Sequence, residues 1–173
     1  MIFFGHLGLT GLAAKAVEKS LGNIKIDYRV VFVGSILPDL IDKPIGRFLF
    51  AETFHTGRVF AHTLLFIFLL LGIGYYRWHR YQKSGWLVLT GSCLFHDIFD
   101  AMWMIPETFY WPLYGMKFYA STEGSWLQAD LTSLMTDPAS YVPEITGFII
   151  ILYFIRKLIV HHRAKAFLQN GVL

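Results

Sequence analysis

Long apolar runs, separated by short polar stretches, dominate the hydrophobic pattern of the chain. The pattern predicts helices over residues 2–19, 29–42, 59–76, 85–105 and 144–160. Residues 43–58 and 106–143 are predicted to be connections, the second with a short helix near residues 126–135. Most of these runs approach the length of a membrane helix, although the second is short and is predicted to pack inside a bundle.

The composition supports a membrane setting for these helices. Hydrophobic residues make up 55% of the 173 residues and charged residues only 16%, whereas a soluble domain carries about a quarter charged residues. We therefore predict an all-α fold, an integral membrane helical bundle of about five segments in a single domain over residues 1–173. The one cysteine, Cys93, excludes an intramolecular disulfide framework and a cysteine zinc finger.

The basic residues give a predicted orientation. If the loops at 15–29 and 77–83 and the C-terminal tail share one side, 11 of the 15 Lys and Arg residues lie there, and the other side keeps Lys43, Arg47, Arg58 and Lys117. The positive-inside rule then predicts a multi-pass protein of the cell membrane, with the N-terminus outside and the C-terminus cytoplasmic. A re-entrant first pair of helices leaves the last three segments unchanged. The basic residues do not cluster as a nucleic-acid partner would require, so no nucleic-acid partner is expected.

Three ionisable residues interrupt the fourth apolar run. His96 and Asp100 are four residues apart and share one face of a helix, while Asp97 lies beside them at a different angle. Such groups are costly in an apolar segment unless they face the protein interior and bind something.

The same alternation of segments brings other polar residues to this depth. The set contains three histidines and three aspartates: His6, Asp39, Asp42, His62, His96 and Asp100. Imidazole and carboxylate ligands suit a divalent metal such as zinc, with manganese or iron as alternatives, and the carboxylate count allows one or two ions. Each residue also has a plainer explanation, such as an interface histidine, a helix cap or a buried hydrogen-bonded pair.

Three further residues have open roles near this set. Arg58 precedes His62 by one helical turn and would hold a phosphate oxygen, or form a salt bridge with Asp39 or Asp42. Asp97 would orient a ligand imidazole or act as general base. His55 is either a further ligand or a substrate contact.

Four sequence blocks resemble a known family. They are LPDLIDKP at 37–44, GRVFAHTLL at 57–65, FHDIFD at 95–100 and PETFYWPLYG at 106–115. Their order and spacing are similar to those of the membrane-bound metal-dependent hydrolases, also described as LexA-binding inner-membrane-associated hydrolases. The resemblance implies metal ligands at His6, at Asp39 with Asp42, at His62 in the block of Arg58, and at His96 with Asp100. Many members carry a histidine where this chain has Gly57. Zinc-dependent phospholipase C is more distantly similar.

Together, the residues and the resemblance predict a membrane-bound metal-dependent hydrolase. It would cleave a phosphoester or a lipid-linked substrate at the outer membrane interface with a metal-activated water. The alternative is a non-catalytic membrane protein whose metal or polar site is structural or serves partner binding. A catalytic metal site keeps an open coordination position and a structural one is closed.

Overall fold

The computed structural model describes residues 1–22, 24–120 and 126–173, and these residues form helices and turns without a strand. The longer helices are α1 (Phe4–Ser20), α2 (Tyr28–Pro44), α4 (Leu64–Tyr81), α5 (Gly85–Phe99), α7 (Trp126–Thr136) and α8 (Pro138–Val160). The short ones are α3 (Ala51–Phe54), α6 (Pro106–Phe109) and α9 (Ala164–Asn170), with a π-turn at Ile45–Leu49 and a 3₁₀ turn at Met102–Met104. The all-helical prediction is confirmed.

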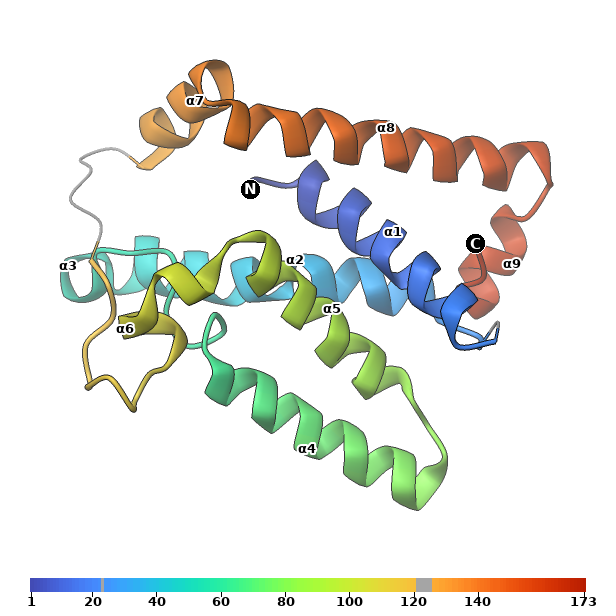
Figure 1. Cartoon of the computed structure of the whole chain (residues 1–173), viewed down its shortest axis with the longest axis horizontal. Coiled ribbons are helices and arrows are strands. Elements are labelled where there is room, and N and C mark those ends of the chain that lie inside the picture. The colour runs from blue at the N-terminus through green and yellow to red at the C-terminus, as the bar shows by residue number, and fades with distance from the viewer. Residues whose placement is uncertain (23, 121–125) are drawn as a thin grey trace.

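Helix α2 lies at the centre of the arrangement and contacts both α1 and α5. The α4–α5 hairpin packs on one side of it, and α8 runs along α1 on the other (Figure 1). Gly8 of α1 and Gly147 of α8 meet backbone to backbone, because a Cβ atom on either would collide with the other helix. Small residues at a crossing allow this close approach. The contact holds the start of α1, and with it His6, against the rest of the bundle.

Glu144 of α8 fixes the entry to α1. Its carboxylate accepts hydrogen bonds from the backbone N–H groups of Ile2, Phe3 and Phe4 at 2.6–3.2 Å. The first N–H groups of a helix have no partner within the helix, and a carboxylate at that end also complements the helix dipole. A residue distant in sequence therefore caps the helix that carries His6.

Four helix ends differ from the sequence prediction. Helix α4 ends at Tyr81 rather than residue 76, and α5 ends at Phe99 rather than residue 105, so Asp100 follows the helix as its C-cap. Helix α4 begins at Leu64 rather than residue 59, because the Thr63 side chain caps it and residues 59–62 fold around the buried carboxylate of Asp42. Helix α8 begins at Pro138 rather than residue 144, because the Asp137 side chain accepts a hydrogen bond from the N–H of Ala139. The predicted connection at 43–58 is partly helical. The predicted short helix near 126–135 is present as α7.

The prediction of membrane-spanning segments is not confirmed. Among the described residues, no helix combines the length and the apolar character needed to cross a membrane. The five-segment spanning bundle and its orientation therefore stay predictions.

Candidate metal centre

His96 is held on α5 by the backbone of α2. Its Nδ1 atom lies 2.7 Å from the carbonyl oxygen of Ser35, and a carbonyl only accepts, so Nδ1 carries the proton. The Nε2 atom of neutral His96 is then an acceptor with a free lone pair. The side chain is fully buried. A histidine fixed in this way through one nitrogen is the arrangement found in metal sites.

His62 is oriented in the same way by a carboxylate. Its Nδ1 atom lies 2.7 Å from Oδ2 of Asp42, which also accepts hydrogen bonds from the backbone N–H groups of Val59, Ala61 and His62. Asp42 is completely buried behind the imidazole. Both oxygens of Asp42 accept hydrogen bonds from the backbone of residues 59–62, and Oδ2 also contacts the His62 ring. Asp42 therefore orients His62.

The two histidines point their remaining nitrogens at each other. The Nε2 atoms of His62 and His96 are 3.2 Å apart. Because both Nδ1 protons are already donated, two neutral rings would place two lone pairs face to face, and only a proton or a metal ion between them relieves this. Bonds of about 2.0–2.1 Å from one tetrahedral zinc would separate its two nitrogens by about 3.3 Å. The residues fit a shared metal ion.

Asp39 completes one ligand group. Its Oδ1 atom is 3.6 Å from Nε2 of His62 and 4.0 Å from Nε2 of His96. Its other oxygen, Oδ2, accepts a hydrogen bond from Lys43 at 2.6 Å. The ligand atoms of Asp39, His62 and His96 lie within 4.8 Å of one another, close enough to hold one ion.

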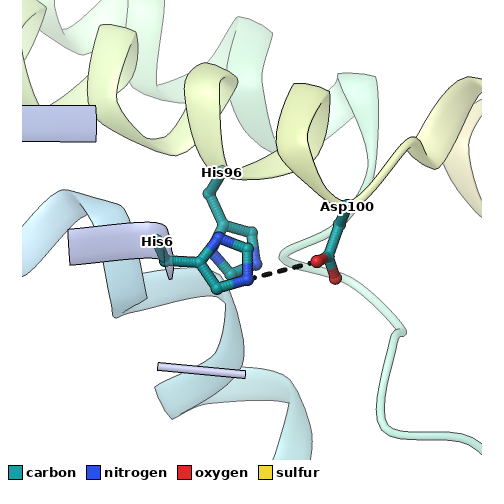
Figure 2. A group of neighbouring side chains, drawn as sticks. All are labelled: His6, His96 and Asp100. Carbon is teal, nitrogen blue, oxygen red and sulfur yellow. Dashed lines mark ion pairs between the residues drawn. The ribbon is translucent and has the colours of Figure 1, made fainter. Parts of the chain in front are cut away.

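His6 and Asp100 form a second group with the same His96. The imidazole of His6 stacks on that of His96 with ring centroids 3.9 Å apart, and both rings face Asp100 (Figure 2). Nε2 of His6 comes within 3.1 Å of Oδ1 of Asp100 but is not aligned as a hydrogen bond to any described residue. This contact is an ion pair without hydrogen-bond alignment, and its two atoms are placed as ligands of a common cation would be.

Asp100 also carries the ion pairs of the site. Its Oδ2 atom accepts from Nε and Nη2 of Arg58 at 3.0 and 2.7 Å. Its Oδ1 atom lies 2.9 Å from the amino group of Met1. The partner of Arg58 is therefore Asp100, not Asp39 or Asp42 as the sequence alternative had it. The Arg58 side chain is still 38% exposed.

The charges of the buried groups are set by their surroundings. Burial lowers the pKa of His62, but its hydrogen bonds to Asp39 and Asp42 outweigh this and raise the pKa to about 9. Burial, with the nearby His6, lowers the pKa of His96 to about 3. In the metal-free protein Nε2 of His62 is thus protonated, 3.2 Å from Nε2 of His96 and 3.6 Å from Oδ1 of Asp39, and a metal ion has to displace that proton.

Asp97 is a buried carboxylate outside both groups. It is 1% exposed, and neither oxygen has a hydrogen-bond partner among the described residues. Burial raises its pKa to about 8, against the opposing effect of His62. Its catalytic role stays a prediction.

The remaining predicted positions lie at the edge of this centre. His55 is exposed at the end of α3 and belongs to neither ligand group. Gly57, the position where the resemblance implied a histidine, packs against the guanidinium of Arg47, which would collide with a side chain there. Ser35 was missed by the sequence reasoning. It acts through its backbone carbonyl, which every residue carries, so no side-chain pattern in the sequence could have identified it.

A known family model matches most of the chain. The family model described as "YdjM inner membrane protein" matches residues 1–165, a range that includes both ligand groups. No curated protein and no solved structure matches the chain. The inner-membrane part of the resemblance is therefore confirmed, whereas hydrolase activity and the similarity to phospholipase C stay predictions.

Proposed function

The chain belongs to the YdjM inner membrane protein family, and we propose that it acts there as a membrane-associated, metal-dependent hydrolase. The observation that carries the proposal is the pair of ligand groups, Asp39–His62–His96 and His6–His96–Asp100, which meet at one shared histidine. Zinc is the best-matched ion for this set of nitrogen and oxygen donors, and manganese or iron accept the same donors.

The number of ions follows from His96. Its Nδ1 proton is donated to Ser35, so only Nε2 is available, and it serves both groups. One lone pair binds one metal ion. A single ion that takes ligands from both groups is thus favoured over two separate ions.

The residues around the ligands have distinct roles in the proposal. Asp42 and the Ser35 carbonyl hold the protons on the Nδ1 atoms of His62 and His96 and so keep both Nε2 atoms directed inward. A bound divalent metal would polarise a phosphoryl or acyl group and lower the pKa of a water to about 7. Asp97, whose carboxylate has no described hydrogen-bond partner, is proposed as the general base for the attacking water at pH values above its raised pKa of about 8.

Two cations flank the ligands on the more exposed side. Arg58 and Lys43, with side chains 38% and 31% exposed, pair with Asp100 and Asp39 and can turn toward an incoming anion. An arginine binds phosphate oxygens in a bidentate manner. The proposed substrate is a phosphoester, and the membrane family makes a lipid or lipid-linked phosphoester the preferred form.

The test compares histidines inside and outside the groups. His96→Ala and Asp100→Ala should lose bound metal by elemental analysis and lower hydrolysis of bis(p-nitrophenyl) phosphate by at least about 100-fold. His79→Ala, an exposed position on α4, is the matched control and should keep both. Unchanged metal content in the first two variants would refute the metal centre.

The burial of the ligands favours one alternative function. The side chains of His6, His62 and His96 are completely inaccessible, as expected of a closed structural site. In that case the metal would stabilise the bundle or a partner-binding form. The same experiment separates the catalytic site from the structural one. The site is structural if His96→Ala loses the metal and the wild-type protein hydrolyses no phosphoester.

A further inference from the structure

A second polar site lies at the opposite end of α5 from the metal centre. A cavity of about 430 Å³ opens between the segment before α2, the end of α4 and the beginning of α5. Gly85, which lines the cavity, precedes His96 by 11 positions, and this spacing corresponds to about 16 Å along a helix. None of the metal-centre residues lines it, so whatever binds here is independent of the proposed hydrolase.

The lining of this cavity is cationic. Lys25, Arg77 and Lys83 contribute three positive charges, and none of them forms an ion pair within the described part of the chain. Asp27 is the one acidic residue of the lining, and both of its oxygens are bound by the guanidinium of Arg29 at 2.6 and 2.9 Å. The cavity therefore has an uncompensated positive charge.

Two sets of hydrogen-bond donors at this cavity lack partners. The Nε atom of Arg77 is buried and has no partner in residues 1–22, 24–120 and 126–173. Ser84, at the start of α5, makes no side-chain cap to the first N–H groups of that helix. Free N–H groups at a helix N-terminus favour an anion, as does a guanidinium. An anion in the cavity would give the guanidinium group and the helix N-terminus the acceptors that no described residue supplies.

We propose that this cavity binds a phosphate group. Phosphate matches the site because its several oxygens can accept from Arg77, two lysines and the α5 N-terminus at once. Its charge offsets that of the lining. The surroundings indicate which phosphate. Trp86 lines the cavity, Trp78 and Tyr81 lie in the last turn of α4, and all three are 36–54% exposed. Exposed aromatic residues next to basic ones are typical of a membrane interface. An anionic phospholipid headgroup is therefore the expected source, with free phosphate as the other source of the same chemistry.

The test uses two arginines of the same helix. The full-length protein in neutral detergent is titrated with nanodiscs of phosphatidylglycerol or phosphatidylcholine. Arg77→Gln should weaken binding to phosphatidylglycerol about tenfold, whereas Arg80→Gln, which removes the same charge from an exposed site outside the cavity, should change it less than twofold. Equal losses in the two variants would overturn the proposal, because surface charge alone then explains the binding.

Inorganic phosphate distinguishes the two sources. Calorimetric binding of phosphate that is lost in Arg77→Gln identifies a site for free phosphate, and lipid binding without phosphate binding identifies a headgroup site. No Arg77 dependence of either ligand overturns the proposal. Lys83→Gln is the second variant if Arg77→Gln does not fold, as judged by circular dichroism. Metal content should be unchanged in all these variants.

Discussion

The polar groups at the two ends of α5 differ in whether they are paired with neighbouring residues. At the carboxyl end, His96 and Asp100 are buried and bound to neighbours on α1, α2 and the 59–62 turn. At the amino end, Lys83 and Arg77 line an open cavity and form no ion pair among the described residues. The first end is organised before any ligand arrives, and the second offers charge that a ligand would neutralise. Loss of a residue should therefore cost stability at the first end and only binding at the second.

The largest difference is expected from Asp42→Ala at the metal end. The variant leaves the N–H groups of Val59, Ala61 and His62 without an acceptor and frees the His62 ring. Each buried donor without a partner costs about 1–3 kcal/mol, so the free energy of unfolding should fall by at least about 4 kcal/mol. Denaturant unfolding in detergent, followed by circular dichroism in the presence of a chelator, measures it without a metal contribution.

Lys83→Ala is the matched change at the cationic end. Its side chain is exposed and unpaired in the described structure, so the free energy of unfolding should change by no more than about 0.5 kcal/mol. A comparable loss in the two variants would mean that both ends are structural, and the contrast between them would not hold.

The same contrast explains how much of the site the sequence could predict. The spacing of His96 and Asp100 places both on one helix turn, and the structure confirms it with the hydrogen bond from the N–H of Asp100 to the carbonyl of His96. Local periodicity sets such relations. The separate roles of Asp39 and Asp42 depend on where the 59–62 turn closes, and no pattern within α2 specifies that contact.

The fold shows the same limit. Apolar periodicity predicted the bounds of α1 and α2 closely, but not the starts of α4 and α8, which the side chains of Thr63 and Asp137 determine. It also missed the ends of α4 and α5. The pairing of Arg58 with Asp100 joins residues 42 apart in sequence. The salt-bridge alternative for Arg58 named Asp39 or Asp42, and tertiary packing brings it to Asp100 instead.

A pH series should separate the two ends next. The proton on His62, with a pKa of about 9, competes with metal for Nε2, so it must leave whenever metal binds below that pH. Apparent metal affinity should therefore rise about tenfold, or about 1.4 kcal/mol, for each pH unit between pH 6 and 8. Competition with a chromophoric chelator at each pH gives the affinity. Phosphatidylglycerol binding, measured at the same pH values, should not follow this slope, because no residue of the metal centre lines the cavity. Metal affinity that does not depend on pH would show that His62 is not a ligand.

Salt should give the smallest effect and the clearest separation. The cations of the amino end face an open cavity, and charges in contact with solvent are screened over about 10 Å at 0.1 M salt. Raising NaCl from about 0.05 to about 0.5 M should therefore weaken phosphatidylglycerol binding several-fold. The side chains of His96 and Asp100, the proposed metal ligands, are buried, so salt hardly screens their interactions. Metal content measured on the same samples should therefore not change. A parallel loss of metal and lipid would indicate that the two sites are coupled through α5, whereas salt-insensitive lipid binding would show that apolar contacts, not Lys25, Arg77 and Lys83, hold the lipid.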